Sequence, residues 1–326
     1  QGLLVQYSQG LVQNKTGAAG ATDTPKLKLS LGELDLSKIN IAYQDEQSRL
    51  KTKLDFKKLF VKFDKTDLSN QVILVDNIEF NSAEATLALG KIKKIIAPTP
   101  VTTTGRNDWD VKIKKVSLNR IGFTFDDDNA KATLKGIDYK HLRLSGLSSQ
   151  INNIHYSDIS TSATVASLSV KEHSGLAIES FTADLFYGRK NAFFKNLYLK
   201  TPQTVVQNQI EIGYPSIESI ANNLGDISIN ANLQKSSIGF KDILVFVPTL
   251  AKTNPFKDNP NAILKIDTKV GGKLKNISIP KLQISGLGST IVNASAKITG
   301  LPNVDKANFD LVSKRLELFC SKRNDS

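Results

Sequence analysis

Cysteine and methionine are almost missing from this sequence of 326 residues: Cys320 is the single cysteine, and there is no methionine. One cysteine excludes an internal disulfide and any zinc site that needs several cysteines. Because an initiator methionine is missing, we interpret the sequence as a piece of a longer protein. The strand pattern stops before the tail 318–326, so we expect a truncated end there and assign no function to Cys320.

Long apolar runs are also absent. A helix that crosses a bilayer needs about 20 consecutive apolar residues, and the longest notable run here, Ile243–Val247, is far shorter. The first residues lack the basic start and the cleavage site of a signal peptide. With 40% hydrophobic and 23% charged residues, the composition is that of a chain that folds rather than of a disordered tail.

Patterns typical of catalysis and metal binding are scarce. The three histidines, His141, His155 and His173, show no metal-ligand spacing. The acidic run Asp126–Asp128 lacks the glycine and the glutamate that a calcium-binding loop of the EF-hand type requires downstream. We therefore expect a hairpin turn at this run, and we expect no enzymatic activity, no metal and no cofactor.

Positive charge is in excess, with 43 Lys and Arg against 31 Asp and Glu, a net charge of +12. Such an excess is compatible with an anionic partner such as phospholipid or nucleic acid. The basic residues are mostly dispersed lysines without interleaved aromatic residues, which favours a solvated surface. We expect no nucleic-acid partner.

The dominant positive signal is alternation of apolar and polar residues with a period of two. It is clear at Ile39–Gln44, Leu59–Asp64, Ile121–Asp126 and Val292–Thr299. Turn residues separate these runs, so the pattern predicts an antiparallel meander with one apolar and one polar face. Helical spacing appears only at 215–224 and 240–247.

An apolar sheet face has to be buried, and two short helices cannot cover a face of this size. The sheet either folds onto itself as a sandwich or curls into a trough with an apolar interior. The trough is the interpretation that we favour. Its predicted lining consists of Ile41, Tyr43, Val61, Phe63, Ile121, Phe123, Phe125, Leu142, Leu144, Leu282, Ile284, Val292 and Ala294.

A weak internal repeat suggests that the chain is built from stacked β modules. Segment 34–45 matches segment 116–127, and Phe56–Leu59 matches Tyr139–Leu142. Stretches rich in Thr, Gly, Ala and Pro, 14–25 and 97–107, precede the two copies and have the composition of linkers.

The chain also resembles a known family. The resemblance is most specific in the last third of the chain and is carried by Asp242–Leu250, Asn259–Ala262, Asp267–Gly272, Ile279–Thr290 and Ile298–Ala307, with Trp109–Leu118 and Asp126–Asp127 upstream. These segments are similar to the TamB branch of the AsmA-like proteins (translocation and assembly module), in the version typical of Bacteroidetes.

The resemblance implies an all-β fold: a long antiparallel sheet, curled into an elongated hydrophobic groove (a β-taco) with one or two short helices. It implies a periplasmic protein of a Gram-negative envelope, anchored to the inner membrane through segments absent from this sequence. The implied function is movement of phospholipid between the inner and outer membranes, support of outer-membrane protein assembly, or both. The implied partners are phospholipid acyl chains and an outer-membrane barrel of the TamA/BamA type.

From these observations we expect an N-terminal segment and linker at 1–25, a β-groove module at 26–96, a linker at 97–107, a second module at 108–210 and a helix-containing module at 211–326. Some twenty strands, about 4.8 Å apart, would give a trough of about 100 Å. The alternative is a binding or scaffold protein, similar to an adhesin, built from stacked β-sandwiches without a lipid conduit.

Overall fold

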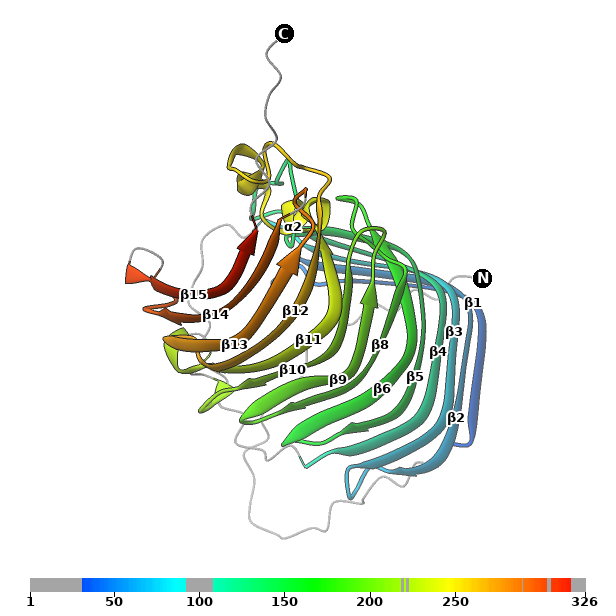
Figure 1. Cartoon of the computed structure of the whole chain (residues 1–326). Helices are drawn as coiled ribbons and strands as arrows, with labels where there is room; N and C mark the ends of the chain where they lie inside the picture. Colours follow the sequence, from blue (N-terminus) through cyan, green and yellow to red (C-terminus); the bar gives the residue numbers. More distant parts are fainter. Residues whose placement is uncertain are drawn as a thin grey trace.

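The computed structural model of the chain contains one large β-sheet (Figure 1). It describes residues 31–91 and 108–317, except 218, 219, 221, 222, 289, 304 and 305. Both predicted linkers and Cys320 lie outside the described residues. The strands are β1 (Glu33–Gln44), β2 (Leu50–Asp67), β3 (Val72–Leu89), β4 (Asp110–Asp127), β5 (His141–Tyr156), β6 (Ser160–Glu172), β7 (Ala177–Ile178), β8 (Ser180–Gly188), β9 (Asn191–Lys200), β10 (Val205–Gly213), β11 (Ser228–Gly239), β12 (Ile263–Lys273), β13 (Asn276–Ser285), β14 (Ile291–Thr299) and β15 (Asn308–Glu317).

The strands follow one another across the sheet in the order of the sequence, with the short β7 attached to β6. Neighbours are antiparallel, as the alternation and the turn residues predict, except for β3 and β4, which are parallel. A parallel pair needs a connection that returns along the strands, and most of the residues between β3 and β4 lie outside the described part of the chain. The predicted antiparallel meander is therefore interrupted at this one place, and the sheet is mixed.

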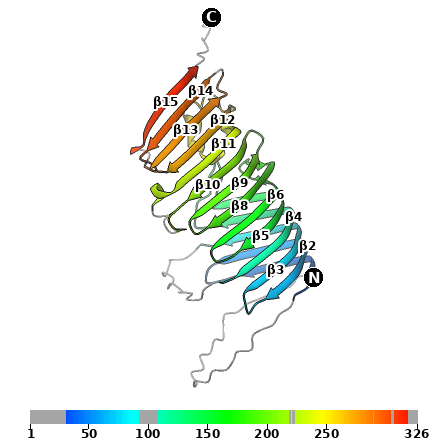
Figure 2. The ribbon, with the colours of Figure 1, turned by 60° about the horizontal axis from the view of Figure 1, so that its bottom comes forward.

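The apolar face of this sheet is not paired with a second sheet among the described residues, because all described strands belong to the same 15-stranded sheet. The alternative of stacked β-sandwiches is therefore wrong for this part of the chain. Figure 2 shows the strands side by side as one ribbon. With a spacing of about 4.8 Å between strands, the sheet extends for about 60 Å, which is shorter than the 100 Å expected from the sequence.

Several strands bend near their middle (Figure 1), and left-handed backbone residues occur near the middle of these strands. Lys38, Ser82 and Arg120 have φ angles of 55°, 50° and 56°, and the ladder skips a pairing at each of them. At Arg120 the register also shifts, which makes a bulge that kinks the strand and increases its local twist, whereas at Lys38 and Ser82 the register is the same on both sides of the skipped pair. Asn196 in β9 and Lys235 in β11 have the same left-handed conformation, so the bend recurs across the sheet.

The internal repeat is partly reproduced. Lys38 of β1 and Arg120 of β4 occupy matching positions of the repeat and share the left-handed conformation. The second match fails, because Phe56 is buried in β2 whereas Tyr139 is exposed in the connection before β5. The connection between β4 and β5 is longer than the turn between β1 and β2, so the two copies lose their alignment there.

Of the two predicted helices, the second is confirmed as α2 (Phe240–Phe246), followed by the 3₁₀ turn η2 (Pro248–Lys252). Pro248 supplies no backbone donor and ends the α-helix, as expected. In the first predicted helix Ile217 and Ile220 are helical, and the chain forms the 3₁₀ turn η1 at Leu224–Asp226. The predicted boundary between residues 210 and 211 falls inside β10.

Candidate binding site: an apolar trough

The apolar residues of neighbouring strands face one another and form continuous rows across the sheet. Phe123 of β4 lies opposite Leu144 of β5, and Phe125 lies opposite Leu142. On the other side of β4, Phe123 is beside Ala85 and Phe125 is beside Leu87. Two adjacent rows from β1 to β5 therefore contain six of the predicted lining residues: Ile41, Tyr43, Phe123, Phe125, Leu142 and Leu144.

The remaining predicted residues of this half lie in other rows. Val61 of β2 is opposite Leu34 and Ile78, and Phe63 is opposite Val75. Ile121 lies at the bend, between Ala83 and Leu147. The alternation in the sequence predicted these residues as lining residues. It did not show that irregularities in the strand pairing place them in different rows of the sheet.

The predicted residues of the C-terminal half also meet in pairs. Leu282 of β13 lies opposite Ala294 of β14, and Ile284 lies opposite Val292. On the other side of β13, Leu282 faces Thr268 of β12. These residues are separated from the N-terminal rows by β6 to β11, whose own paired residues continue the face: Val165–Ala183, Phe194–Ile210 and Ile210–Ala231.

The apolar face is the inner, concave side of the bend. Phe56, Ala83 and Ile121 lie at the bend and are only 1%, 0% and 7% exposed. A single-layer sheet buries a side chain to this degree only where the two arms converge over it. The rings of Phe56 and Phe80, which lie on either side of the bend of β2 and β3, meet edge to face with centroids 5.3 Å apart. The sheet is therefore a trough, and these residues form its floor.

The floor changes character along the trough. In β1 to β5 the side chains of the two arms fill it, with Leu36, Ile39, Leu59 and others packed against the cluster of Phe56, Ala83 and Ile121. In β11, β12 and β14 the buried floor residues are small: Ser236, Thr268 and Ala294. The Thr268 hydroxyl donates to the Lys281 carbonyl (2.9 Å), and the Ser236 hydroxyl accepts from the Gln207 N–H (3.1 Å).

Sequence reasoning missed these floor hydroxyls, because serine and threonine are usually exposed and interrupt an apolar pattern. Their hydrogen bonds occupy backbone groups beside irregularities in the strand pairing. A buried polar group is tolerated when it is paired in this way. Small floor residues leave the inner face of the C-terminal half less filled by its own side chains than that of the N-terminal half.

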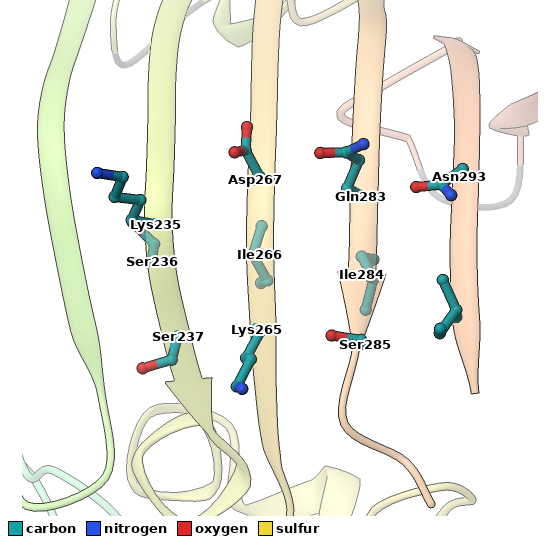
Figure 3. Close-up of a pocket in the computed structure, with 11 residues that line it drawn as sticks. Lys235, Ser236, Ser237, Lys265, Ile266, Asp267, Gln283, Ile284, Ser285 and Asn293 are labelled. Carbon is teal, nitrogen blue, oxygen red and sulfur yellow. The ribbon is translucent and has the colours of Figure 1, made fainter. Parts of the chain in front are cut away.

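The other face of the sheet carries many polar side chains. Figure 3 shows Lys235, Asp267, Gln283 and Asn293 in a row across β11 to β14. Together with Ile266 and Ile284 of the neighbouring row, they line a shallow hollow of about 560 Å³, and Asp267 is paired with Lys281 (2.8 Å). This face also holds aromatic residues, since the rings of Phe186 and Phe193 stack there with centroids 5.2 Å apart.

The apolar face continues to both edge strands. Leu34, Ile41 and Tyr43 of β1 are about two-fifths exposed, and Phe309 and Leu311 of β15 are 64% and 58% exposed. No second sheet layer lies over the trough between these ends among the described residues, because all described strands belong to the same sheet. The arrangement offers an elongated apolar surface to a ligand.

The hairpin turn predicted at the acidic run is only partly confirmed, because Asp126 and Asp127 end β4, the turn begins at Asp128, and residues 128–140 lead to β5. Asp127 is paired with Lys140 (3.0 Å). His141 lies between two acceptors, with Nδ1 3.3 Å from Asp126 Oδ1 and Nε2 3.2 Å from the Ala130 carbonyl. Asp138, the other acidic side chain near this histidine, accepts backbone N–H groups of Thr133, Lys140 and His141.

Partial burial disfavours the charged imidazole, but the Ala130 carbonyl and the Asp126 carboxylate outweigh it, so the pKa of His141 is raised above its usual value of 6.5. A raised pKa in the folded state means that protonation stabilises the fold. This contribution to stability is complete at pH values below the pKa that His141 has in the unfolded chain. It is lost as the pH rises through the higher pKa that His141 has in the folded protein. We expect the stability difference between the wild type and His141→Gln, measured by denaturant unfolding, to shrink over this range. A constant difference would contradict the assignment of a charged His141.

Among the described residues, no group of three or more His, Cys, Asp or Glu side chains has the arrangement of a metal site. No described helix is long and apolar enough to cross a bilayer. A scan against protein-family models and a search of curated proteins found no match to this chain.

Proposed function

We propose that the trough holds the acyl chains of phospholipid and forms part of a path for phospholipid between the inner and outer membranes of a Gram-negative envelope. The observation that supports this proposal is the continuous apolar face without a covering protein layer among the described residues. Each methylene group moved out of water contributes about 0.8 kcal/mol, so a lipid that leaves a bilayer requires a continuous apolar surface. Its head group can remain in water at the open rim.

The proposal includes membership of the TamB branch of the AsmA-like proteins, a periplasmic location and anchoring to the inner membrane outside this sequence. It also includes an outer-membrane barrel partner of the TamA/BamA type. The open, curled sheet is the architecture that this family resemblance implies. The large apolar interior gives the proposal a physical basis that does not depend on the resemblance.

A second candidate function is support of outer-membrane protein assembly. The observation that favours it is the edge strand β15, whose outer edge has no strand partner among the described residues. An unpaired edge can accept a further strand through backbone hydrogen bonds. The exposed Phe309, Leu311 and Val312 would contact the side chains of such a strand.

Site-specific photo-crosslinking in cells tests the lipid proposal. Phe123 lies in the apolar rows, whereas the next residue, Thr124, pairs with Arg143 and Thr86 on the polar face. We expect a crosslinker at position 123 or 125 to capture phospholipid and a crosslinker at position 124 to capture none. Equal labelling at the three positions would contradict the proposal, because it would mean that lipid does not distinguish the two faces.

A further inference from the structure

Two connections that are far apart in the sequence meet on the side of the sheet that is formed by the ends of β4 and β11. One is the segment 128–140 between β4 and β5, and the other is the segment 240–262 between β11 and β12, which includes α2 and η2. The Ile137 N–H donates to the Val245 carbonyl over 3.0 Å. Figure 1 shows the two segments together at the edge where these strands end. We call the pair the rim bracket.

The rim bracket reaches across the ends of the intervening strands. Five strand spacings separate β5 from β11, which corresponds to about 24 Å along the sheet. At the meeting point a Cβ atom on Gly136 would lie 2.6 Å from Pro248 and from the Val245 carbonyl, and Gly136 has a φ of +78°. A glycine is therefore required here, both for the close approach and for the left-handed backbone.

Segment 240–262 of the rim bracket is fixed to the sheet. Asp242 of α2 accepts hydrogen bonds from the hydroxyls of Thr201 (2.6 Å) and Thr204 (2.5 Å) in the turn between β9 and β10. Phe240 is 1% exposed, and the centroid of its ring lies 4.3 Å from the centroid of the Phe256 ring. Side chains that protrude from the bracket are therefore presented by a defined support.

The tips of the rim bracket are unusually apolar for a water-exposed segment. Leu134 is 99% exposed, Tyr139 65%, Phe246 52% and Val247 44%. Each of the two segments contributes a pair of these residues. Single exposed apolar residues are common, but several on two connected segments are typical of an interaction site.

Lysines accompany these apolar tips. Lys131, Lys135, Lys241 and Lys252 are exposed, and none of them takes part in an ion pair between described residues. The carboxylates of Asp138 and Asp242, by contrast, are occupied by hydrogen bonds within the bracket and with its support. Asp128 and Asp258 are exposed as well, but the two segments contain six lysines against four aspartates. The bracket therefore presents a net positive charge beside leucine, tyrosine and phenylalanine side chains.

We propose that the rim bracket docks on the surface of an anionic phospholipid bilayer. Tyrosine and phenylalanine at the interface, leucine at the acyl boundary and lysine toward the head groups are the chemistry of interfacial membrane binding. Lysines near the surface of an anionic leaflet are attracted to it. This inference does not depend on the proposed function, because a protein that carries no lipid in its trough could still bind a membrane through its rim.

Cosedimentation of the full chain with vesicles tests the inference. The vesicles contain phosphatidylcholine with about one third phosphatidylglycerol, an anionic lipid. We compare the wild type with Leu134→Asp/Phe246→Asp and with the control Ile159→Asp. Ile159 is 55% exposed in the turn between β5 and β6, at the opposite edge of the sheet. Because all three positions are exposed, the substitutions should leave the fold intact, which circular dichroism verifies.

We expect the wild type and Ile159→Asp to pellet with the vesicles, and the double variant to lose at least tenfold in partition coefficient. Binding by the wild type should fall on neutral phosphatidylcholine vesicles and with added salt. Equal binding by all three proteins, or no binding by the wild type, would overturn the inference. Light scattering without vesicles tests whether the bracket is instead a contact between two copies of the chain. If the wild type were a dimer and the double variant a monomer, the bracket would be a dimer contact, and the inference of membrane binding would be overturned.

Discussion

Replacing Phe123 by aspartate is expected to abolish the retention of phospholipid while the sheet remains assembled. Phe123 lies between Ala85 and Leu144 on the apolar face and is half-buried rather than buried. A carboxylate at this position can keep water around it, so the fold tolerates the change. The same carboxylate interrupts the apolar surface, and an acyl chain beside it would have to desolvate a charge, which is far more costly than the gain from a few methylene groups.

The control for this variant is Thr124→Asp, which adds the same charge to the same strand on the polar face. Ile284→Glu tests the C-terminal half, since Ile284 faces Val292 and Ile266 on the apolar side. Bound phospholipid is measured by mass spectrometry of lipid extracts at equal protein amounts, and strand content by circular dichroism. If Phe123→Asp and Ile284→Glu retained as much lipid as Thr124→Asp, the apolar face would not be the binding surface.

Replacing Phe56 by alanine is expected to destabilise the N-terminal half of the trough by about 3–5 kcal/mol. Phe56 is 1% exposed and packs against Phe80, Leu54 and Leu59 at the bend. Its removal leaves a cavity that the surrounding strands cannot close without straightening the bend. In a single-layer sheet each strand contacts mainly its neighbours, so we expect the loss to appear as local opening of β1 to β5.

Hydrogen exchange followed by mass spectrometry distinguishes the two halves of the chain. Amides of β1 to β5 should exchange faster in Phe56→Ala, whereas amides of β12 to β14 should be unchanged. Phe60→Ala is the matched control, because Phe60 lies on the polar face of the same strand. The Nζ atom of Lys58 lies 6.0 Å from the centroid of its ring. Equal acceleration by both variants would mean that Phe56 is no more important for the bend than a surface phenylalanine.

The strands were predictable from the sequence because alternation is a local property. Phe123, Thr124 and Phe125 show it directly, and their faces follow from the period of two. The curl was not predictable in the same way, since the same alternation fits a sandwich and a trough. The bend depends on left-handed residues such as Lys38, Ser82 and Arg120, and none of these is a glycine that would have marked the position.

The features that depend on distant parts of the chain had no sequence signal. The parallel pairing of β3 and β4 could not be predicted, because the sequence between these strands has only the composition of a linker. The hydrogen bond between Ile137 and Val245 joins two segments. The sequence predicts one as a loop and the other as a short helix, and it gives no sign that they meet. The small floor residues Ser236 and Thr268 interrupt the apolar pattern, and only the register shows that they lie on the inner face.

The most direct test of the central claim is mass spectrometry of the lipid that copurifies with this chain from a bacterial envelope, in gentle detergent and without added lipid. An apolar trough that accepts acyl chains should retain phospholipid in stoichiometric amounts, and the lipid should be displaced by competing phospholipid. A purified protein with an intact sheet and no bound lipid would contradict the account.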